Sequence, residues 1–214
     1  MCLLNPRLQK IAPKNHLPRN SFSPLNLFAM KKITLFIFCF CLYASIASAN
    51  FLRDLFEQAM EAFGAGQYDQ AIELFQKSLQ IKPDLAPAYN YMGLAYKAKG
   101  SDFPTIMNFF KKAIEADPQY APAYENLGKS YYSIGEIDKA IDYCRKAVKL
   151  QPDLVTANLS LGWIYLLAKS QPRTAIKYFR KVGNGAQLPF ASLGLGIAYF
   201  QDNQYPMMLE TITS

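Results

Sequence analysis

The sequence has few of the residues on which most catalytic and metal sites depend. Its 214 residues include one histidine, His16, four cysteines and one tryptophan. Histidine is the commonest general base and metal ligand near neutral pH, so a chain with one imidazole close to its first residue is a poor candidate for acid–base or metal chemistry. We therefore predict that the protein is not an enzyme and that it has no cofactor and no metal site.

Cysteine is also scarce outside the N-terminal part. Cys2, Cys39 and Cys41 lie in the first 49 residues, which leaves Cys144 alone in the rest of the chain. A single cysteine cannot form an internal disulfide, which excludes a small disulfide-stapled scaffold. Cys144 falls on the apolar stripe of an expected helix and has no histidine partner, so we interpret it as a core residue and not as a nucleophile.

The positive charge of the chain is confined to its N-terminal part. The formal net charge is +7, but six of the 23 basic residues precede Asn50 and all 16 acidic residues follow it. The remaining 17 basic residues therefore nearly balance the acidic ones. The pairs Lys111–Lys112 and Arg180–Lys181 fit solvated helix faces better than a phosphate-binding stripe. We predict no nucleic-acid partner.

The one long apolar run stands near the N-terminus. Met30-Lys31-Lys32 is followed by an uncharged apolar stretch and then by Ala47-Ser48-Ala49, the three parts of a secretory signal peptide. We predict that residues 30–49 are this signal peptide and that cleavage after Ala49 leaves a periplasmic or secreted protein. The alternative is an uncleaved inner-membrane anchor over residues 33–49, the one case in which we expect membrane contact.

The stretch before Met30 has a different character. Residues 1–29 contain four prolines, scattered basic residues and no periodic pattern. We interpret them as a non-native or disordered upstream extension, with a long targeting extension as the alternative.

A motif of apolar residues around a glycine recurs along the rest of the chain. Tyr89-x-x-Met92-Gly93-x-x-Tyr96 returns around Gly128, Gly162 and Gly196, at intervals of 35, 34 and 34 residues. Prolines at 83, 118 and 152 keep the same period. Within a unit the apolar residues recur at helical spacing, and each proline ends a second helix before the next unit begins. The pattern predicts stacked helical hairpins, because one such hairpin cannot bury both of its apolar faces.

A period near 34 residues with these motifs resembles the tetratricopeptide repeat (TPR) family, here a bacterial exported member. The resemblance implies an all-α fold, a right-handed superhelix of stacked antiparallel helix pairs with about four repeats and a truncated fifth. We assign the five units to residues 51–85, 86–120, 121–154, 155–188 and 189–214.

The resemblance also implies a function. Arrays of this family hold protein partners, and their first helices line a concave groove. Transferred to this sequence, the groove positions are Phe56, Met60, Phe63, Asn90, Leu94, Lys97, Glu125, Lys129, Tyr132, Leu159, Trp163 and Leu166, and Leu193, Ile197 and Phe200 continue them. Trp163 is the best anchor candidate, since aromatic rings in concave sites supply much of the binding energy. Packing of Trp163 against a neighbouring helix pair is the equally weighted alternative.

We therefore predict a scaffold or adaptor of the bacterial cell envelope that binds an extended peptide or a helix of an unidentified protein partner in its groove. Two alternatives remain. The first is a structural element that self-associates through the apolar edge of residues 189–214, and the second is a non-catalytic accessory subunit of an enzyme complex.

Overall fold

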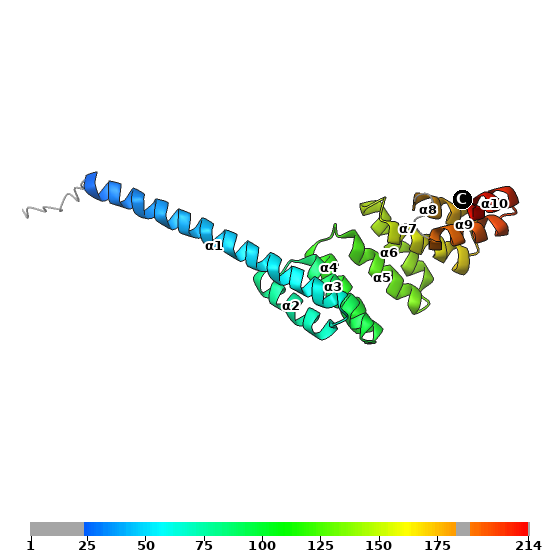
Figure 1. The fold of residues 1–214 in the computed structure, drawn as a ribbon, viewed down its shortest axis with the longest axis horizontal. Coiled ribbons are helices and arrows are strands. Elements are labelled where there is room, and N and C mark those ends of the chain that lie inside the picture. The colour runs from blue at the N-terminus through cyan, green and yellow to red at the C-terminus, as the bar shows by residue number, and fades with distance from the viewer. Residues whose placement is uncertain (1–23, 183–188, 214) are drawn as a thin grey trace, which may run out of the picture. The chain divides into compact units, whose positions relative to one another are not determined.

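The computed structural model describes the backbone of residues 24–182 and 189–213, and every regular element in these ranges is helical (Figure 1). The chain divides into two compact units, Met1–Ala47 and Ser48–Ser214. Residues 1–23 of the predicted upstream extension, and residues 183–188 at the end of the predicted fourth unit, lie outside the described residues.

The first unit contributes one feature, the N-terminal part of helix α1 (Pro24–Gly64). Its described side chains between Met30 and Ala44 are all exposed. Among the described helices, α1 is the one that is long and apolar enough to cross a membrane by length and composition, in its part Met30–Gly64. A signal sequence and a membrane anchor both meet this criterion, so both remain predictions.

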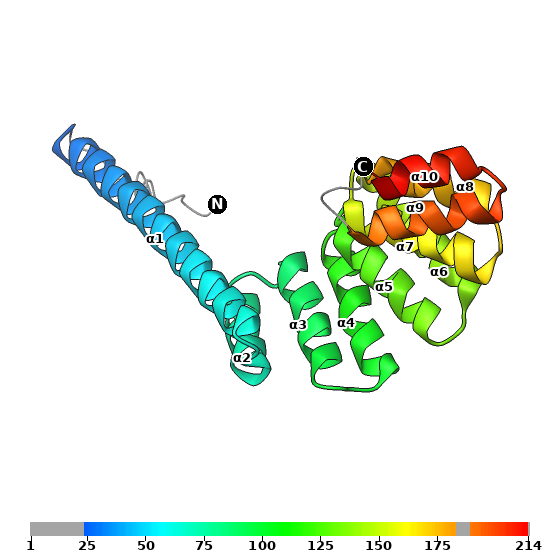
Figure 2. The same cartoon turned by 45° about the vertical axis from the view of Figure 1, so that its right-hand side comes forward.

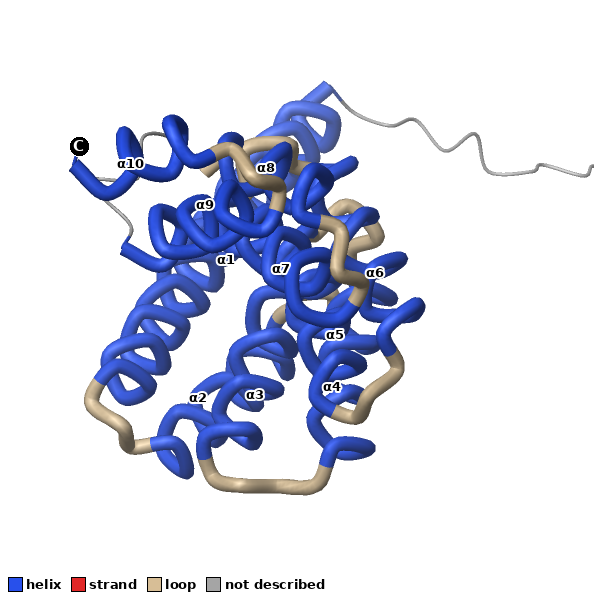
Figure 3. The backbone as a smooth tube through the Cα atoms, turned by 90° about the vertical axis from the view of Figure 1, so that its right-hand side faces the viewer, coloured by secondary structure: helices blue, strands red, loops and turns tan. Residues whose placement is uncertain are grey.

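The second unit begins with the C-terminal part of α1, which forms a hairpin with α2, and continues as further hairpins joined by short loops (Figure 3). The hairpins are α3 with α4, α5 with α6, α7 with α8, and α9 with α10. Their helices are α2 (Tyr68–Ile81), α3 (Ala86–Ala98), α4 (Phe103–Ala116), α5 (Ala121–Ser133), α6 (Ile137–Leu150), α7 (Val155–Trp163), η1 (Ile164–Ala168), α8 (Pro172–Lys181), α9 (Pro189–Gln201) and α10 (Tyr205–Thr213).

The turns inside the hairpins share one backbone conformation. Gly66, Gly100 and Gly135 have φ angles of +74°, +78° and +80°, a region that glycine enters without a steric penalty. The two later turns use Ser170 at φ 50° and Asn203 at φ 59°. The same sharp reversal thus recurs in all five hairpins, as the repeat period predicts.

Small residues let the two helices of a hairpin approach closely. A Cβ on Gly93 would come within 2.6 Å of the Phe110 ring, and one on Gly162 within 2.5 Å of the Phe179 ring. In the third repeat the second-helix partner is smaller: a Cβ on Gly128 would meet the Cys144 sulfur at 2.5 Å. Because glycine has no side chain, each of these positions leaves the space that a buried side chain of the second helix occupies.

The hairpins stack so that first helices approach one another more closely than second helices do. Helices α5 and α7, and α7 and α9, make direct contacts, whereas α4, α6 and α8 are held apart mainly by the first helices between them. Figure 2 shows α5, α7 and α9 side by side. The layer of first helices therefore lies on the inner side of the curve, and the layer of second helices lies on the outer side.

One irregularity interrupts the fourth repeat. The first helix of this repeat does not end at Trp163 but continues as a π-helical segment, η1, in which each turn holds an extra residue. The Gln171 amide then bonds back to the Tyr165 carbonyl across 2.8 Å. The residues from Leu166 onward are thereby displaced from the positions that a regular α-helix would give them.

Candidate functional site

A cavity of about 310 Å³ opens on the inner layer, between the third, fourth and fifth repeats. Four of the predicted groove residues line it: Lys129 and Tyr132 from α5, and Leu159 and Trp163 from α7. Thr156, Ser160, Ile164 and Phe190 complete the lining. The volume lies at the lower end of the range for ligand pockets, enough for one bulky side chain of a partner.

Trp163 both packs and lines this cavity. Its ring meets Phe179 edge-on, with centroids 5.3 Å apart and planes at 76°. It is half-buried, and the remainder of the side chain faces the cavity. Trp163 is thus both of the things that the sequence allowed: one side of its ring packs against Phe179, and the other side faces the cavity. Packing against Phe179 fixes the ring orientation, so little rotamer freedom would be lost when a partner binds.

Lys129 is held at the edge of the cavity by an ion pair. Its Nζ lies 2.9 Å from Oε1 of Glu125, and the Ser160 hydroxyl donates to the same oxygen across 3.2 Å. Glu125 itself is only 4% exposed. The predicted groove residue Glu125 therefore acts beneath the surface, where it positions Lys129 and joins α5 to α7.

Asn90 occupies a similar buried place one repeat earlier. It is 3% exposed, and its Oδ1 accepts a hydrogen bond from Asn126 across 2.9 Å. A buried amide pair of this kind fixes the register of two hairpins, because each group would lose free energy if it were left unpaired. Asn90 thus links α3 to α5 through a buried hydrogen bond and does not lie on the groove surface.

The prediction for Leu166 requires a correction. Leu166 is 1% exposed and lies in the core of the fourth repeat, whereas its neighbour Leu167 is 59% exposed. The cause is η1: the extra residue in the π-helical turn rotates Leu166 inward and brings Leu167 to the surface. The regular helical spacing used to assign groove positions does not hold beyond Trp163.

The remaining predicted residues lie outside this cavity. Phe56, Met60 and Phe63 are half-buried in the core of the first repeat, where Phe56 lies 5.5 Å from Phe75 by ring centroids. Leu94 is half-buried beside the core of the second and third repeats, and Lys97 is exposed. The four predicted groove residues that meet at this cavity thus belong to the third and fourth repeats.

Sequence reasoning missed Phe190. This residue is 69% exposed and reaches the cavity from the first turn of α9. It stands one period after Thr156, which lines the same cavity. That periodic relation to the start of the preceding first helix could have identified it.

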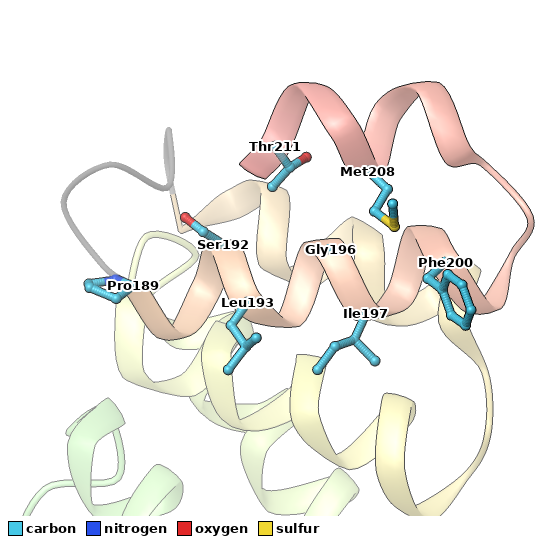
Figure 4. Close-up of a pocket in the computed structure, with 8 residues that line it drawn as sticks. All are labelled: Pro189, Ser192, Leu193, Gly196, Ile197, Phe200, Met208 and Thr211. Carbon is cyan, nitrogen blue, oxygen red and sulfur yellow. The ribbon is translucent and has the colours of Figure 1, made fainter. Parts of the chain in front are cut away.

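A second cavity, of about 480 Å³, lies between α9 and α10 (Figure 4). Its lining comes almost wholly from apolar side chains, with Leu193, Ile197 and Phe200 on α9 and Met208 on α10. Figure 4 shows Met208 reaching from α10 toward α9. Exposed apolar side chains are concentrated here, since Phe190, Leu193, Phe200, Tyr205 and Leu209 are all at least 49% exposed.

Cys144 is a core residue, as its sequence position indicates. It is fully buried, and burial, assisted by the nearby Glu125 carboxylate, raises the pKa of its thiol to about 12. At neutral pH the thiol is therefore protonated and inaccessible, which is the opposite of what a nucleophile requires.

Stacked antiparallel hairpins with a recess on their inner layer define the class: the protein is a helical repeat scaffold of the α-solenoid type. Two segments match TPR family models, residues 63–100 and residues 121–154. The chain therefore contains tetratricopeptide repeats. No curated protein sequence matches it.

Solved structures confirm the fold. PilF of Pseudomonas aeruginosa superposes with a TM-score of 0.68 at 19% identity, over 77% of this chain and 75% of PilF. A thermophilic TPR protein of Thermus thermophilus gives 0.60 at 17% identity, over 75% and 87%. YrrB, described as a TPR protein with an unusual peptide-binding site, gives 0.54 at 20% identity, over 74% and 81%. Protein–protein interaction is the general function of such arrays.

Proposed function

We propose that the protein is a non-catalytic adaptor that holds a segment of a partner protein on its inner layer, with one bulky apolar side chain seated in the cavity beside Trp163. The observation that carries this proposal is the meeting of Lys129, Tyr132, Leu159 and Trp163 around one recess. Three of the four supply apolar surface, and the ring of Trp163 is already held in place by Phe179.

The neighbourhood of the cavity sets the chemistry of the partner segment. Phe190 and Tyr132 extend the apolar surface on either side, and the Lys129 ammonium is the charged group at the edge. A peptide or helix with aromatic or aliphatic anchors fits this surface.

Photocrosslinking in the native host tests the proposal. A photoreactive residue at position 132, which is 38% exposed and lines the cavity, is expected to capture one discrete protein. The matched control position is Gln80, exposed on α2 far along the sequence. The variant Trp163→Ala should lower capture from position 132 by about tenfold or more, the size of a hot-spot loss. Equal capture from positions 132 and 80, or capture unaffected by Trp163→Ala, would rule the groove out.

We also propose that α1 brings the array to the bacterial cell envelope, either as a cleaved signal peptide or as an anchor. Support comes from its exposed apolar side chains and from the Ala47-Ser48-Ala49 sequence that follows them. The mass of the protein isolated from its host separates the two outcomes. A chain that begins at Asn50 establishes cleavage, and a chain that retains residues 33–49 and fractionates with membranes establishes an anchor.

A second candidate function rests on the cavity between α9 and α10. An apolar surface of this kind fits self-association, in which residues 189–209 of two copies cover each other. Sedimentation over a hundredfold concentration range tests it. A dimer that Leu193→Glu converts to a monomer supports self-association, and a monomer at every concentration excludes it.

A further inference from the structure

The outer layer carries a line of basic residues that the inner groove does not explain. The C-terminal halves of α4, α6 and α8, residues 109–116, 143–150 and 176–182, contain eight basic residues and one acidic residue, Glu115. The eight are all exposed: Lys111, Lys112, Arg145, Lys146, Lys149, Lys177, Arg180 and Lys181. We call this set the basic stripe.

The basic stripe is in register with the repeats. The pairs Lys111–Lys112, Arg145–Lys146 and Arg180–Lys181 stand 34 and 35 residues apart, which is the repeat period. Equivalent positions on equivalent helices of a solenoid face the same way. The three pairs therefore form one row along the outer layer of second helices.

Aromatic rings hold these cations in place. In three successive repeats a tyrosine of the first helix stacks on a ring of the second: Tyr96 on Phe109, Tyr131 on Tyr143, and Tyr165 on Tyr178, with centroids 4.8, 5.2 and 5.6 Å apart. Over the second-helix ring of each pair lies the ammonium of Lys112, Lys146 or Lys181, at 5.5, 5.3 and 5.7 Å from the centroid. Such contacts order a lysine without neutralising it.

The arginines of the stripe join neighbouring repeats in the same manner. Arg145 lies over Tyr165 of the next repeat at 5.8 Å, and Arg180 lies over Tyr199 at 5.8 Å. Arg180 also donates to the Tyr199 hydroxyl across 3.0 Å. These arginine contacts link the stripe from the third repeat to the fifth.

The positive charge of the stripe is uncompensated. Seven lysines and arginines of the described chain pair with carboxylates, and none of the seven belongs to the stripe. They are Arg53, Lys77, Lys99, Lys129, Lys139, Lys169 and Arg173. Within the described residues, no carboxylate forms an ion pair with any member of the stripe. Eight like charges without carboxylate partners, five of them held against aromatic rings, raise the local potential and attract an anionic surface.

We propose that the basic stripe is a second interaction surface, which binds an acidic segment of a protein partner. Two observations favour a polypeptide over other anions. A recess of about 430 Å³ opens at the stripe, lined by Lys146, Lys149, Tyr124 and Pro118, and a polypeptide can enter it whereas a flat bilayer cannot. The rings of the stripe are already stacked on one another beneath cations, so they offer no free platform for nucleic-acid bases.

Fluorescence anisotropy with labelled oligo-glutamate, a peptide of ten glutamates, tests this surface on the full chain in a non-ionic detergent. We expect binding at 50 mM salt that weakens steeply toward 0.5 M, because the charges are exposed and screened. The variant K112Q/K146Q/K181Q should bind about tenfold more weakly, as expected for three exposed charge contacts. The control K77Q/K82Q/K99Q removes the same charge from the first and second repeats, outside both the stripe and the predicted groove, and should bind as the unaltered protein does.

Four other outcomes would overturn the proposal. Absence of oligo-glutamate binding at 50 mM salt, or equal weakening in both variants, would show that the stripe is not a site. Stripe-dependent binding of a ten-nucleotide single strand, or of phosphatidylglycerol vesicles over phosphatidylcholine vesicles, that is stronger than binding of oligo-glutamate would assign it to another class of anion. Thermal melts of both variants establish that each is folded. Trp163→Ala leaves this assay unchanged, so failure of the groove proposal and failure of this one are distinguishable.

Discussion

The hydroxyl of Ser160 donates to the buried carboxylate of Glu125 across 3.2 Å, and thereby ties the fourth repeat to the third beneath the candidate groove. The same Glu125 oxygen holds Lys129 at 2.9 Å. One buried acidic group thus serves two purposes. It fixes the relative position of α5 and α7, and it sets the place of the cation at the edge of the cavity.

Glu125→Ala should lower the free energy of unfolding by about 1–3 kcal/mol, because it leaves Lys129 and Ser160 without their shared partner in a mostly buried position. The comparison is Lys77→Ala, which breaks the exposed Glu73–Lys77 pair and should have a much smaller effect, because exposed ion pairs are screened by solvent. Urea unfolding followed by circular dichroism measures both. Equal effects of the two substitutions would mean that Glu125 has no special structural role.

Gly128→Ala should destabilise the third repeat by about 1–3 kcal/mol, since the new methyl group would lie 2.5 Å from the Cys144 sulfur and 3.1 Å from the Ala140 carbonyl oxygen. The backbone atom cannot swing aside as a side chain can. Gly64→Ala is the matched control, because no atom of the described residues lies within 4 Å of its added Cβ. It should be neutral or stabilise by up to about 1 kcal/mol. Thermal melts that show similar losses for both would contradict this packing.

Ser170→Gly should raise the stability by about 0.5–1 kcal/mol. Ser170 is held at φ 50°, a conformation that costs an L-residue free energy and that glycine adopts freely. The reverse change, Gly135→Ser, places the same side chain at φ +80° and should lower the stability by a similar or larger amount. Opposite shifts of the melting temperature are expected. A lower melting temperature for Ser170→Gly would show that the serine makes a contribution that outweighs its strain.

The protein should lose stability between about pH 9 and pH 12 through Cys144. Burial raises the thiol pKa to about 12 in the folded chain, whereas the unfolded chain ionises near 9. Below pH 9 both states hold the proton, and above it the unfolded state loses the proton first, so the free energy of unfolding falls by up to about 1.4 kcal/mol per pH unit from this group.

A chain with Cys2, Cys39 and Cys41 replaced by serine isolates the effect, and Cys144→Ala in that background is the control. Urea midpoints measured from pH 8 to pH 11 should fall more steeply for the chain that keeps Cys144 than for the control. In the same background, a thiol reagent at pH 8 should modify Cys144 only after denaturant is added. Rapid modification of the native chain would show that the thiol is accessible.

The repeat period could be predicted because packing requires it. Gly93, Gly128 and Gly162 must each admit a side chain of the second helix, and no other residue leaves enough space. A requirement imposed on one residue type at one position appears directly in the sequence. The burial of Cys144 followed from the same periodicity, since its position in the helix falls on the core stripe.

The burial of Leu166 and of Glu125 could not be predicted from the periodicity of the sequence. The regular helical spacing used for the prediction does not anticipate the π-helical turn at Ile164–Ala168. Burial of a carboxylate depends on partners 4 and 35 residues away, Lys129 and Ser160. The basic pairs are a third case. The sequence alone led us to interpret Lys111–Lys112 and Arg180–Lys181 as separate solvated faces, and the stacking of the hairpins aligns them with Arg145–Lys146 in one row.

The ion pairs between successive hairpins affect which hairpins can stack on one another. Asp69 at the start of α2 pairs with Lys99 after α3, and Asp138 at the start of α6 pairs with Lys169 after η1. At the equivalent place in the last interface the signs are exchanged, with Arg173 on α8 and Asp202 after α9, 2.8 Å apart.

At the remaining interface the equivalent residues are uncharged, Pro104 and Ile134. A fifth hairpin placed on the first or third would bring Asp202 against an aspartate, and a second or fourth hairpin placed on the fourth would bring a lysine against Arg173. The first and third hairpins therefore favour a successor that carries a lysine at this place and repel the fifth hairpin. The fourth favours the fifth and repels a lysine, so these charges disfavour some wrong neighbours of each hairpin.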